Sequence, residues 1–268
     1  MKILYFGDIF GRPGRDAIAA ALPFLHERWH PDFILGNVEN LAGGRGVNRK
    51  SLQELVELGF HGFTSGNHIW DNKEVYTLFS DFPQLFRPSN YPSPEETPCP
   101  GKGYGVLSNQ KGSQLFIVNV LGRVFMDALE CPFHACEIAL KANSEKLPVL
   151  VDVHAEATSE KYALGWFLNG KAALVVGSHS HVQTADERIL SQGTAYITDV
   201  GLNGSFDSVI GLHVENAIRR FQTKRPVPFE VATANPGVSC VLVEIDSFGR
   251  ASRITRFRQE IHSFGVGR

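Results

Sequence analysis

Five short apolar runs in this chain each stop at side chains of the kinds that bind metal ions. The runs are rich in β-branched and aromatic residues, a composition typical of β-strands. We therefore expect strands that deliver their ends to one edge of a sheet, where carboxylates, amides and imidazoles gather. The side chains that end the runs are Asp8, Glu39, Asn40, Asn67, His154, His179 and His181, with His68 beside Asn67.

The first third of the chain alternates strand-like runs with amphipathic, helix-like segments. The elements expected are strands 2–7, 33–38 and 61–65 and helices 14–29, 48–58 and 71–79. Asn48 is suited to cap the second helix, and Pro23 predicts either a kink or an early end in the first. This βαβαβ order predicts right-handed crossovers and a largely parallel sheet.

The rest of the chain predicts a second group of strands and helices. Residues 83–103 are rich in Pro, Ser and Gly, and we expect a surface excursion there. The further elements expected are a hairpin of strands 104–108 and 114–120, strands 148–153, 172–177, 194–200, 229–233, 240–246 and 252–259, and helices 132–143, 159–170 and 213–223. We expect an α/β fold in which two sheets pack face to face with helices outside. No repeat or boundary divides it, so residues 1–268 are expected to form a single domain.

Composition excludes several classes of function. With 268 residues, 43% of them hydrophobic, the chain can bury a core, and its net charge of −2 argues against a broad grip on nucleic acid or membranes. The start, MKILYFGD, reads as a strand and not as a signal peptide, because Asp8 interrupts a short apolar run. The four cysteines form no CxxC pair, which is typical of free thiols in a reducing cytoplasm.

The candidate ligands mix oxygen and imidazole donors without a thiolate. Such a set favours Fe or Mn, with Zn, Ni and Co as alternatives, over Mg or Ca alone. The number of donors is enough for two ions, and a carboxylate such as Glu39 can bridge them. Each residue alone has a simpler interpretation: Asp8 as a turn residue, Asn67 as a turn residue, and the HSH pair as solvated histidines. The combination, in this order at five strand ends, favours a metal centre.

The order of these motifs resembles the calcineurin-like metallophosphoesterases, and most closely their bacterial YmdB-like branch. The resemblance rests on six blocks that are spread over most of the chain from residue 7 onward: GDIFGRPGR, NVENLAGGRG, GNHIWDN, DVHAEATSEKYALGW, VGSHSHVQTAD and AYITDVGLNG. It departs from the wider superfamily at one point, because the third position of the usual D-x-H motif is Phe10. In the YmdB-like branch the asparagine after the bridging glutamate compensates, and Asn40 is present.

The resemblance implies a four-layer αββα sandwich and a role for each ligand. Asp8, Glu39, Asn40 and His181 would hold the first ion, and Glu39 would bridge to a second ion held also by Asn67, His154 and His179. His68 would stay off the metals and assist the leaving group while a metal-bridging hydroxide attacks phosphorus. Asp152 and Asp199 are candidates to orient a ligand imidazole, although Asp152 could equally be a buried residue with a structural hydrogen bond. Arg12 and Arg15 either bind phosphate or begin a solvated helix face.

The activity implied is a metal-dependent phosphodiesterase acting on small phosphodiesters. Cyclic nucleotides are the expected class, 2′,3′-cyclic nucleotides first and 3′,5′-cyclic AMP second. A phosphomonoesterase or protein phosphatase on the same centre is one alternative, and a metal-loaded regulatory protein with little turnover is another. The resemblance also favours a homo-oligomer. The sequence shows no basic stripe beside the site blocks, so we expect no stable binding of nucleic acid.

Overall fold

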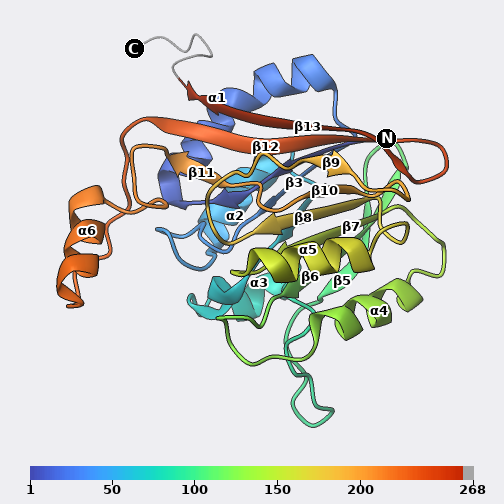
Figure 1. Cartoon of the computed structure of the whole chain (residues 1–268), viewed down its shortest axis with the longest axis horizontal. Helices are drawn as coiled ribbons and strands as arrows, with labels where there is room; N and C mark the ends of the chain where they lie inside the picture. The colour runs from blue at the N-terminus through green and yellow to red at the C-terminus, as the bar shows by residue number, and fades with distance from the viewer. Residues whose placement is uncertain (262–268) are drawn as a thin grey trace.

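The computed structural model describes residues 1–261, and its strands form two mixed sheets (Figure 1). The strand order of the first sheet is β2-β11-β12-β1-β3-β4, with β13 also paired to β12; that of the second is β5-β6-β7-β8-β10-β9. The first sheet contains β1 (Lys2–Phe6), β2 (Asp8–Ile9), β3 (Phe33–Asn37), β4 (Gly62–Thr64), β11 (Leu202–Ser205), β12 (Pro236–Ile245) and β13 (Ala251–Glu260). The second contains β5 (Tyr104–Ser108), β6 (Gln114–Leu121), β7 (Val149–His154), β8 (Leu174–Ser178), β9 (Arg188–Ile189) and β10 (Ala195–Ile197).

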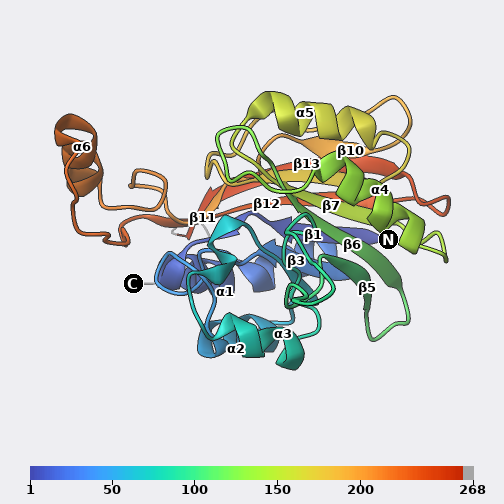
Figure 2. The same ribbon diagram turned by 90° about the horizontal axis from the view of Figure 1, so that it is seen from below.

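Helices cover the outer face of each sheet, so the layers run helix, sheet, sheet, helix (Figure 2). The helices are α1 (Gly11–Trp29), α2 (Arg49–Glu57), the 3₁₀ helix η1 (Asn67–Trp70), α3 (Val75–Asp81), α4 (Pro132–Ala142), α5 (Thr158–Phe167) and α6 (Val214–Thr223). The side chain of Asn48 accepts a hydrogen bond from the Ser51 amide and caps α2, as predicted. The expected four-layer αββα sandwich is confirmed.

The alternation of β1 explains why the layers stack in this way. Ile3 and Tyr5 are fully buried in the core between the two sheets. Leu4 and Phe6 point to the opposite face and pack in the core under α1 and α2. Successive side chains of a strand face opposite sides, so a central strand buried on both faces is apolar throughout. A third core lies between the second sheet and the helices α4 and α5.

Three expectations about local structure were wrong. Residues 229–233 form no strand and make only an isolated bridge between Leu212 and Val231, because this segment belongs to a long connection between β11 and β12. The helix expected at 71–79 begins later, at Val75, after the turn of η1. The first helix runs through Pro23 to Trp29, so the alternative of an early end is wrong.

The segment 83–103 is only partly a surface excursion. Residues 92–98 are exposed as expected, but residues 85–88 are buried. The Phe86 amide donates to the carbonyl of Phe63 in β4. The Arg87 side chain donates to the carbonyl oxygens of Pro88 and Pro100. Buried backbone and guanidinium groups need such partners, and the pattern of Pro and Gly did not reveal them.

The connection between β11 and β12 carries α6 away from the layers (Figures 1 and 2). Residues 206–235 form this connection, which we call the α6 arm, and the Phe206 amide closes its base by donating to the Asn235 carbonyl. The short strand β11, which we did not predict, pairs parallel with β2 and sets Leu202 opposite Asp8. The arm therefore begins close to the first candidate ligand. Within residues 1–261, no helix is both long and apolar enough to span a bilayer.

Candidate metal centre

The structure brings together all eight side chains singled out from the sequence, and they come from both sheets. Asp8 begins β2 and His154 ends β7, while His179 directly follows β8. The remaining positions are these: Glu39 and Asn40 follow β3, Asn67 and His68 open η1 after β4, and His181 follows His179. Because β1, β3 and β4 run parallel, as do β6, β7 and β8, their carboxyl ends meet at one side of the sandwich.

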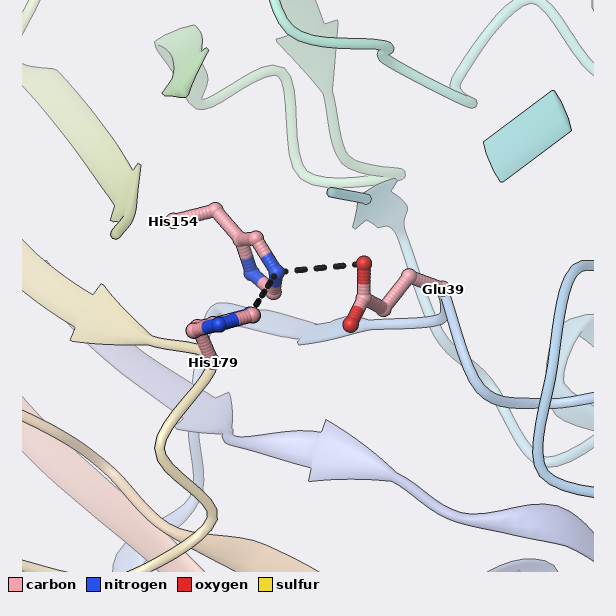
Figure 3. A group of neighbouring side chains, drawn as sticks. All are labelled: Glu39, His154 and His179. Atoms are coloured by element: carbon pink, nitrogen blue, oxygen red, sulfur yellow. Dashed lines mark hydrogen bonds and ion pairs between the residues drawn. The ribbon is translucent and has the colours of Figure 1, made fainter. Parts of the chain in front are cut away.

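Two groups of donor atoms share Glu39. One contains Glu39, His154 and His179, and the other contains Asp8, Glu39 and His181; in each, the potential ligand atoms lie within 4.8 Å of one another. Figure 3 shows the first group, with the Glu39 carboxylate and the His179 ring both turned toward His154. A carboxylate common to two donor groups is the arrangement that a pair of neighbouring ions requires.

Each of the three histidines has one ring nitrogen bonded to protein and the other directed at the centre. The outer partners are the Ser178 hydroxyl for His154 Nδ1 at 2.9 Å, the Glu156 carboxylate for His179 Nε2 at 3.2 Å, and the Ile210 carbonyl for His181 Nδ1 at 2.8 Å. The Glu156 and Ile210 oxygens can only accept, so those nitrogens donate. The Ser178 hydroxyl donates to Asp152, which leaves it to accept from His154. Metal-binding histidines commonly have this second partner.

The inner nitrogens face other acceptors, which is unfavourable without a cation. His154 Nε2 lies 3.1 Å from Glu39 Oε2, 3.0 Å from His179 Nδ1 and 3.2 Å from Asn67 Oδ1. A single proton can satisfy only part of this set, whereas a metal ion accepts lone pairs from all of them. The donors present therefore fit a bound ion.

The second group shows the same signature. The Asn40 amide nitrogen donates to the Gly44 carbonyl, and this directs its oxygen to His181 Nε2 at 3.2 Å. Asp8 is fully buried, and its Oδ1 has no hydrogen-bond partner among the described residues. Its Oδ2 accepts from the His179 amide at 3.1 Å. A buried carboxylate oxygen without a partner is costly, and a cation would satisfy it.

Burial and mutual charge shift the pKa values of these groups. Burial raises the pKa of Asp8 to about 6. Burial opposes ionisation of Glu39 as well, but the neighbouring His154 imidazole outweighs it and holds the pKa of Glu39 below its ordinary value. The pKa of His154 is raised in turn, because Glu39 overcomes the effect of burial. Burial, with His154 close by, lowers the pKa of His179 to about 3. The acids around His154 thus favour a positive charge beside its Nε2, which a bound metal ion would supply, and His179 keeps a free lone pair.

His68 lies beside the donor groups without belonging to either. Its Nδ1 lies 2.8 Å from Asp71 Oδ2, and its amide donates to Glu39 Oε2 at 3.1 Å. The carboxylate of Asp71 is an acceptor, so Nδ1 carries a proton and Nε2 is the nitrogen left for a substrate. The turn of η1 fixes this geometry, because Asp71 is the C-cap residue of η1 and its amide donates to the His68 carbonyl.

Of the two aspartates considered for orienting an imidazole, Asp152 acts only through an intermediate residue and Asp199 acts on the backbone of the HSH segment. Asp152 does not contact an imidazole directly, because the Ser178 hydroxyl stands between it and His154. Among residues 1–261, Asp199 forms no hydrogen bond with an imidazole: it accepts from Lys161 Nζ at 2.8 Å and from the Ser180 amide and hydroxyl. Through Ser180 it fixes the segment between His179 and His181, whose backbones adopt φ values of 97° and 64°.

Sequence reasoning missed several supporting residues. Ser178, Glu156 and Asp71 each bond a histidine of the centre, and all three lie within three positions of a predicted ligand or of His68. Proximity to a ligand in sequence is the signal that could have found them. Arg12 and Arg15, in contrast, have partners within the protein: Arg12 pairs with Asp16 on the surface of α1, and the largely buried Arg15 pairs with Glu54 of α2. The phosphate-binding alternative for these two arginines is not supported.

A cavity of about 350 Å³ opens over the centre. Its lining includes Glu39, Asn40, His68, His179 and His181, together with Phe10, Arg45, Glu156, Ile210, Leu212, Arg220 and Phe229. A larger cavity, of about 630 Å³, lies between the ends of α1 and α2 and contains none of the candidate donors. Size therefore does not identify the reactive site here, whereas the convergence of donor atoms does.

Comparison with known proteins gives matches over nearly the whole chain. The family model described as YmdB-like protein matches residues 4–257. A Bacillus subtilis protein named 2′,3′-cyclic-nucleotide 2′-phosphodiesterase is 44% identical over 247 residues, which cover 92% of each chain. A structure from Thermus thermophilus, described as a hypothetical protein, superposes with a TM-score of 0.90 at 41% identity, covering 97% of this chain and 99% of that one.

A second solved structure, described as a novel phosphatase from Mycoplasma pneumoniae, has a TM-score of 0.89 at 31% identity, covering 97% of this chain and 93% of the other. The fold and the donor set define a metal-dependent phosphoesterase. Within that class, the chain belongs to the YmdB-like family.

Proposed function

We propose that this protein is a binuclear phosphodiesterase that hydrolyses small phosphodiesters, with 2′,3′-cyclic nucleotides as the preferred substrates. One observation carries the proposal: two groups of donor atoms, on buried and half-buried side chains, share the Glu39 carboxylate beside a cavity that also contains His68. The name of the Bacillus subtilis relative supports the substrate class. Hydrolysis of 3′,5′-cyclic AMP remains the second candidate, because the centre itself does not distinguish the two esters.

The proposed ligands of the first ion are Asp8, Glu39, Asn40 and His181, and those of the second are Glu39, Asn67, His154 and His179. When bound, two divalent or trivalent ions, for which Fe and Mn suit the donors best, supply Lewis acidity and a hydroxide at neutral pH. The donors come from both sheets, so we infer that the sandwich acts as a single domain.

The residues of the chain fix the orientation of the ligands, and one of them, His68, can transfer a proton. The partners Ser178, Glu156 and Ile210 fix the three imidazole rings before an ion arrives. His68 is oriented by Asp71 and lines the cavity, and in its imidazolium form it can donate the Nε2 proton to the leaving oxygen of the ester. The α6 arm forms one wall of the cavity in which the ester would lie.

The test combines metal analysis with an assay of bis-p-nitrophenyl phosphate and 2′,3′-cyclic AMP. We expect about two ions per chain, turnover of both compounds, and loss of both ions and turnover in Glu39→Ala. Glu145→Gln is the matched control, because Glu145 is an exposed carboxylate outside the donor groups, and this variant should retain both ions and its turnover.

Two results would contradict the proposal in different ways. Two bound ions without turnover of either diester would favour a regulatory protein or a phosphomonoesterase, and p-nitrophenyl phosphate would separate these. Failure to bind any metal after reconstitution would remove the metal centre altogether.

A further inference from the structure

The α6 arm forms one wall of the cavity over the candidate metal centre. Ile210, Leu212, Arg220 and Phe229 of the arm line this cavity together with the ligands Glu39 and His181. The volume of about 350 Å³ is near the lower end of the range for small-molecule sites, about 300–1,000 Å³. The site is therefore built for a ligand about the size of a nucleotide, and the arm touches whatever part of it extends beyond the reacting ester.

The base of the arm is fixed to the centre and does not project freely. Phe10 lies between them: its ring centroid is 5.4 Å from that of His181 and 6.4 Å from that of Phe229. Gly211 and Gly44 allow this approach, because a Cβ atom on either would lie about 2.9 Å or less from an atom of Phe10. The residue that replaces a histidine of the wider superfamily thus anchors the arm.

Two arginines in this cavity have no carboxylate partner. Arg45 and Arg220 both line the cavity and both are exposed. Within residues 1–261 neither forms an ion pair; Arg45 instead lies over the ring of Phe229, with Cζ 4.7 Å from its centroid. This contact holds the guanidinium at the rim without neutralising its charge.

The acids nearby are already engaged. In the cavity itself, Glu39 belongs to both donor groups, and Glu156 accepts a hydrogen bond from His179 Nε2 at 3.2 Å. On the arm, Glu230 accepts from Asn216 at 3.0 Å, and Glu215 pairs with His213 at 3.1 Å. Among residues 1–261, neither arginine lies within ion-pair distance of these carboxylates, so both keep free hydrogen-bond donors next to the centre. Guanidinium groups match phosphate well, because they donate several hydrogen bonds from one plane.

We propose that Arg45 and Arg220 bind a second phosphate of the substrate, one that does not react. The proposal rests on the proposed phosphodiesterase function: the metal centre takes the scissile diester, and the arginines at the rim take an additional phosphate on the same molecule. The preferred substrates are then cyclic nucleotides that carry a further phosphate, such as a nucleoside 2′,3′-cyclic phosphate with a 5′-phosphate.

The experiment compares adenosine 2′,3′-cyclic phosphate with its 5′-phosphorylated form. We expect the metal-loaded protein to hydrolyse the 5′-phosphorylated compound with a kcat/KM at least roughly tenfold higher, the range for a hydrogen bond to a charged group. Arg45→Gln and Arg220→Gln should each lower that ratio toward one, mainly through KM. Arg220→Lys should retain part of it, because the charge remains. Because both substrates are measured on one preparation, incomplete metal loading cancels from the ratio.

Arg219→Gln is the matched control, since it removes the same charge from the adjacent position of α6, which does not line the cavity. It should leave the ratio unchanged. Equal kcat/KM values for the two compounds in the unmodified protein would overturn the second-phosphate site while the phosphodiesterase stands. An equal loss of the ratio in Arg219→Gln would also overturn it, because the preference for the 5′-phosphate would then come from the overall positive charge of the arm and not from a specific contact. A metal-loaded protein that hydrolyses neither compound would instead refute the proposed function, and this inference with it.

Discussion

The hydroxyl oxygen of Ser178 lies 2.9 Å from His154 Nδ1 because the register of β7 and β8 sets these two residues opposite each other. The same hydroxyl donates to Asp152 Oδ1 at 2.7 Å. It can therefore only accept from the imidazole, which fixes the proton on Nδ1 and the lone pair on Nε2. Asp152 in turn is held by Tyr5, Thr64 and Asn37, so the orientation of a proposed ligand derives from a buried network between the sheets.

Replacing Ser178 by alanine removes this bridge without touching a proposed ligand. We expect metal affinity to fall by about 10- to 100-fold, the usual cost of losing an outer partner of a ligating histidine. Titration of the apoprotein with Mn²⁺ measures the affinity directly. Ser144→Ala, at an exposed loop position, is the control. Unchanged affinity in Ser178→Ala would show that packing alone orients His154.

His68→Ala is expected to separate chemistry from metal binding. The His68 ring belongs to neither donor group, so metal content should stay the same, while kcat falls by about 10²–10⁴ if Nε2 protonates the leaving oxygen. Metal analysis and steady-state kinetics on the same preparation check both parts. A substrate with a better leaving group, such as a p-nitrophenyl ester, should lose less, because it needs little protonation. An equal loss on both substrates would assign His68 to binding and not to proton transfer.

Lys161 and Asp199 form a buried ion pair behind the two ligands of the HSH segment. Their side chains are 2% and 0% exposed, and Nζ lies 2.8 Å from Oδ2. Lys161→Met leaves the carboxylate buried without its cation, and we expect it to lower the free energy of unfolding by about 3–5 kcal/mol. Urea denaturation in the presence of EDTA measures this loss, with the exposed Lys141→Met as control. A loss below about 1 kcal/mol would mean that Ser180 and water satisfy Asp199.

Asp186 is expected to make the stability of the fold depend on pH in the acidic range. Burial alone would raise the pKa of Asp186, but hydrogen bonds from Thr184, Thr198 and Tyr162 outweigh it and hold the pKa below its ordinary value of 3.8. A carboxyl group whose pKa is lower in the folded state stabilises the fold above its unfolded pKa, and this contribution is lost as the pH falls through the folded value.

We therefore expect the stability advantage over Asp186→Asn to be full at pH 6 and smaller at pH 3. Unfolding free energies of the two proteins, measured in parallel across this range, give the difference. The exposed Glu95→Gln should show no comparable change with pH. A difference that stays constant with pH would show that Asp186 acts through hydrogen bonding that protonation leaves intact.

The sequence predicted the layers and most of the strands because their signals are local. Apolar runs such as those of β1 and β7 are hydrophobic throughout, as strands buried on both faces must be. The cap at Asn48 was also visible, since a side-chain acceptor before an amphipathic segment needs no distant partner. In contrast, the prediction of a strand at 229–233 was wrong. Its β-type residues are used in the α6 arm, and only the long connection between β11 and β12 decides that.

The sequence by itself determined which side chains could form the centre, because each proposed ligand ends a strand-like run and parallel strands end on the same side of a sheet. Tertiary structure decided everything that depends on contacts between distant segments. It joined Ser178 to His154, placed the carbonyl of Ile210 against His181, and brought Arg220 to the cavity from an arm that no local pattern distinguishes. Local pattern specifies strands and their ends, but hydrogen-bond partners and unpaired charges are properties of residues that meet only when the chain is folded.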